Sequence, residues 1–450
     1  MKKIELSEKF TSGKIILYAL PAIISIIVTT SFGLVDGYFV SNLLGVDQFA
    51  AVNLVFPVLT VFPAAGYMIG SGASAVISDT IGKGNRDAAC EKFSMTLALT
   101  LVTGVILGVI GYFSLPALIN LLGADEELHG YCMEYGQIML WFLPAFMVNM
   151  AFETLWITAE KSWNGFIFSV INGATNAFLD WLFIGCFGMG VMGAGLATAI
   201  AHLTAALLTI VYFLLPNKSS LRLRRFKPAV LKDIPGIFFN GASEMLGTVA
   251  GAVGIWVMNE RALSFLGEIG VDALGVFDYI FGMFAAFFYG ISNTSVTVIG
   301  YKHGKRSLDE IRELLKRGII LMLIGGVLMF ALCEIFAEPF AGLFVGYDDA
   351  AHELAVHSIK VQAVTFILFG FNIYTSSVFT GLGDGLSSIF IAASQTLVAP
   401  VIFVFLLTEL VGAEGIWYTI VAESASTAVL TVLLLLTRFK RSLLSEKESE

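Results

Sequence analysis

Residues 15–40, IILYALPAIISIIVTTSFGLVDGYFV, decide the fold: this apolar run contains a single charged residue, Asp36. A helix of about 20 such residues crosses a hydrocarbon core of about 30 Å. Hydrophobic residues make up 57% of the 450-residue chain and charged residues 14%, with a mean hydropathy of +0.84, which excludes a soluble domain of this size. We therefore expect an all-α integral membrane protein. Twelve runs predict its transmembrane helices: 15–40, 48–79, 93–115, 132–157, 163–186, 191–215, 234–258, 272–299, 318–337, 358–380, 386–408 and 415–437.

Basic residues predict the orientation of these helices. Of the 26 Lys and Arg residues, only Arg261 and Lys360 fall in the connections that would be outside if the N-terminus is cytoplasmic. The outer connections are acidic instead, as at Asp125 and Asp348. This bias is the one that cytoplasmic loops carry, so both termini are expected in the cytoplasm of a cell whose inner membrane holds the protein.

The two halves of the chain resemble one another, which predicts an internal repeat. Residues 44–47 (LGVD) return as 269–272 (IGVD), and residues 70, 84 and 86 return as Gly, Gly and Arg at 290, 304 and 306. Six helices per half give both halves the same orientation, so we expect two bundles related by a pseudo-twofold axis along the membrane normal. The predicted organisation is an N-terminal lobe at 1–216, a basic cytoplasmic linker at 217–232, and a C-terminal lobe with a charged tail at 233–450.

Acidic and amide side chains interrupt the apolar runs of the first half. Asp36 lies near the end of the first run, and Asp180 follows Asn172 and Asn176 in residues 166–185, FIFSVINGATNAFLDWLFIG. The spacing i, i+4, i+8 places the last three on one helix face. An ionisable group at such depth costs about 2.5–3.5 kcal/mol on insertion scales, so the acids indicate function.

Thr198 and His202, on the sixth run, are expected at a depth comparable with these acids. Carboxylates, an amide oxygen and a hydroxyl are hard oxygen donors that hold Na⁺ or share a proton. The alternative is a polar network that only joins helices, which stays open for Asn172 and Thr198. We expect His202 to be a hydrogen-bonded packing residue. The predicted coupling site comprises Asp36, Asn176, Asp180 and Thr198, supported by Asn172 and His202.

The pattern resembles the multidrug and toxic compound extrusion (MATE) family over essentially the whole chain. The resemblance rests on twelve runs in two halves, on Pro21 and Asp36 in the first run, and on residues 82–89, GKGNRDAA, after the second. Asn176, Asp180 and Thr198 match the family's cation site in the N-terminal lobe, in a form similar to the DinF-like branch. Glu244 resembles an acid of the NorM-like branch, but no partner aspartate lies near Asn372.

The resemblance implies antiport, in which Na⁺ or H⁺ enters while an organic, often cationic, compound leaves. Asp36 would then be the residue whose protonation or ion binding bends the first helix at Pro21. No cofactor is expected beyond the coupling ion, and the four cysteines follow no metal or redox spacing. Expected partners are a small organic substrate and membrane lipid, without nucleic acid, and the protein is expected to be a monomer.

Candidate groups for a substrate cavity lie in the second half. A carboxylate there would neutralise a cationic compound, and Met and aromatic side chains would provide an adaptable apolar surface. A packing or lipid-facing stripe is the alternative for the aromatic run. The candidates are Glu244, Asp278, Phe281, Met283 and Phe287.

Two other functions fit the sequence less well than export. A flippase for lipids or lipid-linked oligosaccharides has a related architecture but favours a strongly basic cavity, and few basic residues lie deep in a run. An integral-membrane enzyme would need a motif such as HExxH, which is missing from the sequence, so we expect no enzyme. The favoured function is a cation-coupled exporter of amphipathic organic compounds.

Overall fold

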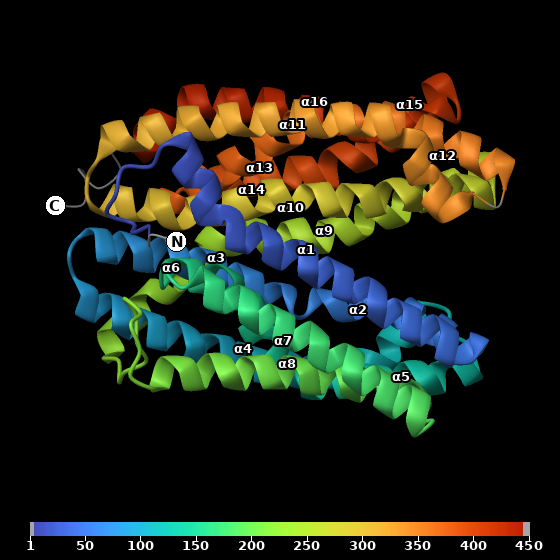
Figure 1. The fold of residues 1–450 in the computed structure, drawn as a ribbon, viewed down its shortest axis with the longest axis horizontal. Coiled ribbons are helices and arrows are strands. Elements are labelled where there is room, and N and C mark those ends of the chain that lie inside the picture. The colour runs from blue at the N-terminus through green and yellow to red at the C-terminus, as the bar shows by residue number, and fades with distance from the viewer. Residues whose placement is uncertain (1–3, 347, 444–450) are drawn as a thin grey trace. The chain divides into compact units, whose positions relative to one another are not determined.

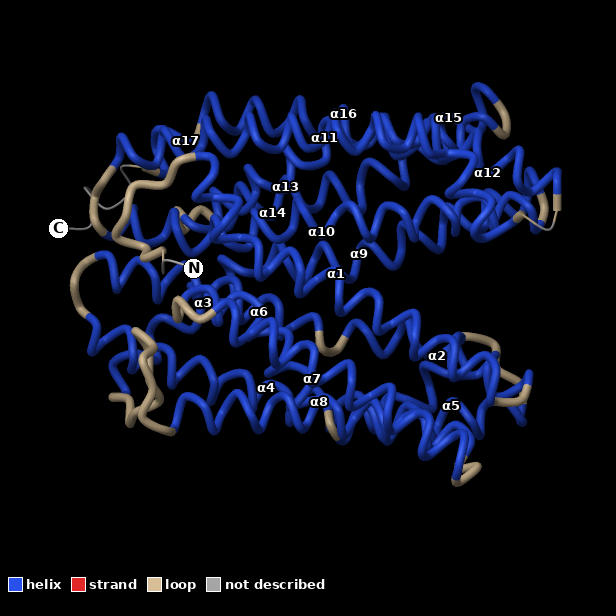
Figure 2. The backbone as a smooth tube through the Cα atoms, viewed as in Figure 1, coloured by secondary structure: helices blue, strands red, loops and turns tan. Residues whose placement is uncertain are grey.

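The computed structural model describes residues 4–346 and 348–443. The outermost parts of the predicted lobes and tail, residues 1–3 and 444–450, lie outside the described residues. Within the described part the chain is helical and contains no strand (Figure 2). Eleven of its helical segments are long and apolar enough to cross a membrane, and a bent pair makes the twelfth. The prediction of twelve spans in an all-α membrane protein is confirmed.

The first six spans run from α1 to α8 (Figure 1). Their elements are α1 (Ser12–Leu43), α2 (Val46–Val61), α3 (Ala64–Gly82), α4 (Arg86–Leu121), α5 (Glu126–Trp141), α6 (Leu143–Thr158), α7 (Ser162–Asp180), the π-helix η1 (Trp181–Cys186) and α8 (Gly190–Leu214). The 3₁₀ turn η2 (Pro228–Asp233) ends the linker that follows.

The last six spans run from α9 to α16. Their elements are α9 (Ile234–Leu266), α10 (Glu268–Gly304), α11 (Leu308–Val345), α12 (Asp349–Gln362), the 3₁₀ turn η3 (Ala363–Thr365), α13 (Phe366–Gly381), α14 (Gly385–Ala393), the π-helix η4 (Ser394–Val398), α15 (Ala399–Val411) and α16 (Glu414–Thr437). The short helix α17 (Phe439–Ser442) follows.

The chain forms two compact units. The N-terminal unit comprises residues 24–241, and the C-terminal unit comprises residues 1–23 together with 242–450. The beginning of α9 thus belongs to the N-terminal unit, where a Cβ on Gly72 of α3 would lie 2.0 Å from the Ile237 carbonyl oxygen. The beginning of α1 belongs to the C-terminal unit, where a Cβ on Gly290 of α10 would lie 2.4 Å from Ile23 Cγ1. A glycine on the second span of each half therefore receives the first helix of the other half. The predicted lobes, 1–216 and 233–450, divide the chain by its sequence repeat and not by compactness, so their limits stay a prediction.

Proline accounts for one difference between the halves. The fourth span bends by 59° at Phe142, between α5 and α6. Pro144 lies in the first turn of α6, where its missing N–H and fixed φ favour a new helix start. The tenth span reaches the corresponding point at Thr365, 223 residues later, and tightens into η3 without breaking. Residue 367 there is isoleucine, so the backbone N–H is kept.

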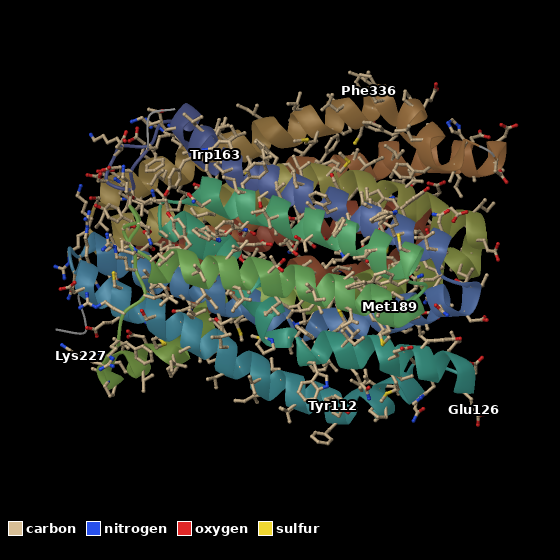
Figure 3. The ribbon with its side chains drawn as sticks, turned by 60° about the horizontal axis from the view of Figure 1, so that its bottom comes forward. Tyr112, Glu126, Trp163, Met189, Lys227 and Phe336 are labelled. Carbon is tan, nitrogen blue, oxygen red and sulfur yellow. The ribbon has the colours of Figure 1, made fainter. Side chains whose placement is uncertain are left out.

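The helix surfaces suit a lipid environment. On α4, residues 102, 105, 106, 109, 110 and 113 are valine, isoleucine or phenylalanine with exposures between 52% and 78%. Their spacing makes one apolar stripe, which would be a liability in water but matches hydrocarbon. In the N-terminal unit, Figure 3 places Lys227 and Glu126 at opposite ends of the helices. This separation of basic and acidic groups agrees with the charge bias of the sequence.

The N-terminal segment is held against α10 and α11 of its own unit. Lys302 is fully buried, donates to the Glu8 carbonyl oxygen at 2.9 Å, and pairs with Glu310 at 2.7 Å. These partners satisfy its buried ammonium group, as a lysine in this position requires.

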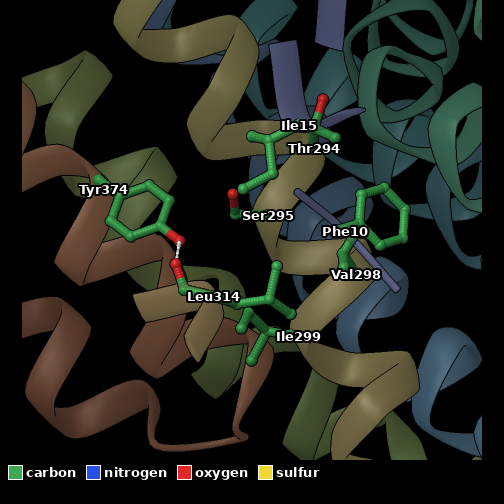
Figure 4. Close-up of a pocket in the computed structure, with 8 residues that line it drawn as sticks. All are labelled: Phe10, Ile15, Thr294, Ser295, Val298, Ile299, Leu314 and Tyr374. Atoms are coloured by element: carbon green, nitrogen blue, oxygen red, sulfur yellow. Dashed lines mark hydrogen bonds between the residues drawn. The ribbon is translucent and has the colours of Figure 1, made fainter. Parts of the chain in front are cut away.

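The same N-terminal segment also borders a small cavity. Phe10 and Ile15 line this cavity of about 10 Å³ together with Tyr374 (Figure 4).

The repeat recurs in the turns, with a different register from the sequence match. After α3, Gly84 adopts φ +82°, and after α10 Arg306 adopts φ +57°. In both turns the next residue donates its N–H to a carbonyl five positions back, Asn85 to Thr80 and Ser307 to Lys302. Gly84 thus corresponds to Arg306, 222 residues later, and the predicted pairing of Gly84 with Gly304 is wrong by two residues.

These two turns provide a matched test of backbone strain. Only glycine adopts this left-handed conformation freely, and other residues lose about 1–2 kcal/mol there. We expect Arg306→Gly to raise the melting temperature of the purified protein and Gly84→Ala to lower it. A Cβ on Gly84 meets nothing within 4 Å, so packing does not confuse the comparison. Gly236→Ala, which also meets nothing within 4 Å and lies outside the left-handed region, is the control. The same change in melting temperature for all three variants would contradict the assignment.

Candidate functional site: a carboxylate pair in the N-terminal unit

Three helices of the N-terminal unit carry the predicted coupling residues. Asp36 lies on α1, Asn176 and Asp180 lie on α7, and Thr198 lies on α8. Asp180 is the last residue before η1, where the helix widens to π geometry. Such widened turns occur frequently at functional sites.

Asn176 joins the three helices. Its Nδ2 lies 3.2 Å from Asp36 Oδ1 and 3.2 Å from Thr198 Oγ1. An amide nitrogen carries two hydrogens, so Asn176 can donate one to each neighbour. The structure therefore brings Asp36, Asn176 and Thr198 together, although they are up to 162 positions apart in the sequence.

Asp180 completes the cluster without a donor of its own. The residue is fully buried, and within the described residues neither carboxylate oxygen has a hydrogen-bond partner. The Asp36 carboxylate lies close enough to interact with it by charge and, once either acid is protonated, by a hydrogen bond. Two facing carboxylates without a counter-charge are unfavourable in a site of low dielectric. This carboxylate pair, Asp36 and Asp180, can therefore hold a proton or a small cation.

The two supporting residues lie outside this hydrogen-bonded cluster. The His202 ring stacks on Phe146 with ring centroids 4.0 Å apart, and its Nδ1 lies 3.1 Å from Asn149 Nδ2. This is the packing role that the sequence indicated for His202. Asn172 is half-buried and forms no hydrogen bond with the cluster in the described part of the chain.

The substrate-cavity candidates do not share one surface. Phe281 stacks on Phe366 with centroids 5.5 Å apart, as part of the packing between α10 and α13. Phe287 packs against Gly325 of α11, whereas Met283 is 51% exposed and Asp278 is also exposed. Glu244 is half-buried on α9.

Several buried polar residues were missed by the sequence interpretation. Tyr135 of α5 is 3% exposed and lies within electrostatic reach of both Asp36 and Asp180. Asn149 and Gln395 are amides inside apolar spans, and such placement was the available signal. Their partners come from distant helices, so spacing along one helix could not reveal them.

Long apolar helices that enclose a buried carboxylate pair define a polytopic membrane protein with a candidate ion site. The comparison with family models makes this specific: the MatE model matches residues 21–182 and 241–406. The chain belongs to the MatE family. The predicted family, fold class and absence of enzymatic activity agree with this result.

Named relatives and solved structures are similar over nearly their full length. The multidrug export protein MepA of Staphylococcus saprophyticus is 25% identical over 430 residues, covering 93% of this chain and 92% of the relative. MepA of Staphylococcus aureus matches to the same extent. A crystal structure of a MATE protein in complex with MaL6 superposes with a TM-score of 0.90 at 24% identity, over 98% of this chain and 99% of that one. At this identity the structural likeness establishes the fold alone.

The unpartnered carboxylate of Asp180 leads to a stability prediction. We expect Asp180→Asn to leave folding intact and to abolish the dependence of the melting temperature on Na⁺ or on acidification. The wild type should gain stability with the ion, since a ligand of the folded state stabilises by RT ln(1 + [L]/Kd). Melting curves from tryptophan fluorescence, recorded across Na⁺ concentration and pH, test this. Asp47→Asn, the same change at an exposed position, is the control. Loss of expression of Asp180→Asn would favour a purely structural role.

Proposed function

We propose that the protein is a cation-coupled antiporter that exports amphipathic, often cationic, organic compounds by alternating access. Na⁺ or H⁺ is the coupling ion, and it binds at Asp36, Asn176, Asp180 and Thr198. The fully buried Asp180 carboxylate, which lacks a donor and faces a second acid, is the observation that carries this proposal. The name of the MepA relatives, multidrug export protein, supports the export of organic compounds.

The coupling follows from the charge of the site. With both acids ionised, the carboxylate pair repels itself, and a bound proton or Na⁺ removes that repulsion. An ion shifts a conformational equilibrium only by its difference in affinity for the two states. Helix α1 offers a place for such a difference, because it carries Asp36 in its outer half and Pro21 within its length. Proline removes one helical hydrogen bond and permits bending.

The remaining parts of the proposal concern surroundings and partners. The protein resides in the inner membrane of a bacterium with both termini in the cytoplasm, as the distribution of Lys and Arg supports. It acts as a monomer on small organic molecules and contacts membrane lipid along its exposed apolar stripes. The similarity of the coupling site to the DinF-like branch is part of the same proposal.

Transport in proteoliposomes tests the coupling role of Asp36. Wild-type protein should drive uptake of a fluorescent organic cation, such as ethidium, when a Na⁺ gradient or a pH gradient is imposed, and the effective gradient identifies the ion. Asp36→Asn should lose gradient-driven transport, because an amide at this position neither accepts a proton nor neutralises a cation.

The matched control is again Asp47→Asn, which removes a carboxylate from an exposed position in the same unit. It should transport like the wild type. If gradient-driven transport of ethidium by Asp36→Asn equals that by the wild type, the proposed mechanism is overturned.

A further inference from the structure

The C-terminal unit contains a buried polar network that the coupling site does not use. Its central residues are Asn372 of α13, Gln395 of η4 and Ser424 of α16, each at most 1% exposed. Asn372 Nδ2 donates to Gln395 Oε1 at 2.7 Å and to the Ser424 carbonyl oxygen at 3.0 Å. Gln395 Nε2 donates to Glu423 Oε1 at 2.6 Å. The network thus connects three spans and ends at one carboxylate.

The orientation of the two amides in this network is determined by their neighbours. The Ser424 carbonyl oxygen can only accept, so the atom of Asn372 that faces it is the nitrogen, while Asn372 Oδ1 lies 3.2 Å from the Thr431 hydroxyl. Gln395 must then present its oxygen to Asn372 and its nitrogen to Glu423. The network therefore supplies an N–H to the Glu423 carboxylate and fixes its position. Gln395 lies in a π-helical turn that precedes Pro400, whose missing N–H disturbs the regular helix there.

The Glu423 carboxylate differs from that of Asp180 in being half-buried and supported by a donor. Asp180 is enclosed and has no donor, whereas Glu423 is half-buried and its Oε1 is supported by Gln395. Glu244 of α9 is also half-buried, and Tyr289 of α10 lies within electrostatic reach of both glutamates. The Tyr289 ring is in turn 5.9 Å from that of Phe369. Two half-buried carboxylates thus interact electrostatically with one tyrosine in the same unit.

The corresponding part of the N-terminal unit lacks this carboxylate. Asn149 donates to the His202 carbonyl oxygen at 2.8 Å, as Asn372 does to that of Ser424. Asn149 and Asn372 are 223 positions apart, and His202 and Ser424 are 222 apart, in the same register as the two turns. In this register Gln395 corresponds to Asn172, and Glu423 corresponds to Ala201. The amide-to-carbonyl link is therefore a common structural device, and the carboxylate is an addition to the C-terminal half.

We propose that Glu423, positioned by Gln395 and accompanied by Glu244 and Tyr289, binds the positively charged group of the exported compound. This proposal deepens the proposed function and rests on it. An enclosed carboxylate pair suits a proton or a small ion, whereas a half-buried carboxylate near a tyrosine suits an organic cation through charge and cation–π attraction. Glu423 is the recognition residue, and Gln395 is a positioning residue.

Equilibrium binding to the purified full-length protein tests this assignment without any ion gradient. The probes are tetraphenylphosphonium and its neutral analogue triphenylphosphine oxide. Wild-type protein should prefer the cation, and Glu423→Gln should bind it about tenfold more weakly while its affinity for the neutral analogue stays the same, since tenfold corresponds to about 1.4 kcal/mol. Equal affinity of the wild type for both probes, or an unchanged affinity of Glu423→Gln for the cation, would overturn the proposal.

Two further variants separate recognition from folding. Glu423→Asp keeps the charge and should retain a preference for the cation, so it replaces Glu423→Gln if that variant does not fold. Gln395→Met cannot donate a hydrogen bond and should weaken cation binding less than Glu423→Gln does. Glu409→Gln removes an exposed carboxylate from α15 of the same unit and should change nothing. A loss in Glu409→Gln equal to that in Glu423→Gln would show an effect of net charge only, and so contradict the proposal.

The result is distinguishable from a failure of the proposed coupling mechanism. Asp36→Asn should bind tetraphenylphosphonium normally and lose only gradient-driven transport. If Asp36→Asn transports normally, the coupling mechanism fails while the binding result for Glu423 stands. If Glu423→Gln keeps its affinity for tetraphenylphosphonium but loses its response to Na⁺ or pH, Glu423 carries the coupling ion and the proposal is wrong.

Discussion

The hydrocarbon core of a membrane supplies no hydrogen-bond partner, and this constraint shapes every polar position in the protein. A buried donor or acceptor must find its hydrogen-bond partner within the chain or in a bound ion or substrate. Most groups satisfy the rule internally, as Asn149 does with His202 and Asn372 with Gln395 and Ser424. Asp180 does not: its two oxygens are enclosed and have no donor among the described residues. Buried hydroxyl groups such as those of Ser71 and Ser292 also lack a partner there, but a carboxylate differs from them because it can carry a charge.

The two halves of the chain share a framework and differ in chemistry. Both have a left-handed turn after the second span and an amide on the fourth that binds a carbonyl of the sixth. These features maintain backbone geometry, so both halves keep them. The carboxylates are unevenly distributed: one half has the pair Asp36 and Asp180, and the other has Glu423 at a position corresponding to Ala201. The two proposed cation sites therefore lie in two halves of one repeated fold.

Much of the fold was predictable because insertion into lipid depends on properties of single segments. All twelve predicted spans correspond to helical segments, which extend up to ten residues beyond the predicted limits, as α11 does before residue 318. The bent fourth span carries the proline that the sequence displays. The register of the repeat was harder, since Arg306 occupies the position that Gly84 holds in the other half. Both residues adopt the left-handed backbone conformation, but only the glycine indicates that conformation in the sequence. A match of residue types therefore missed an equivalence of geometry by two positions.

The sequence by itself determined the membrane class, the number of spans and the stripe of Asn172, Asn176 and Asp180, because hydrophobicity and helical periodicity are local. It also indicated the family, to which the MatE match assigns the chain. Only the tertiary structure decided which polar groups meet: Asn176 with Asp36 and Thr198, His202 with Asn149, and Gln395 with Glu423. Hydrogen bonds act over about 3 Å, whereas their partners lie on helices far apart in the chain. No periodicity within one helix encodes which face of another it will meet, and packing alone settles that choice.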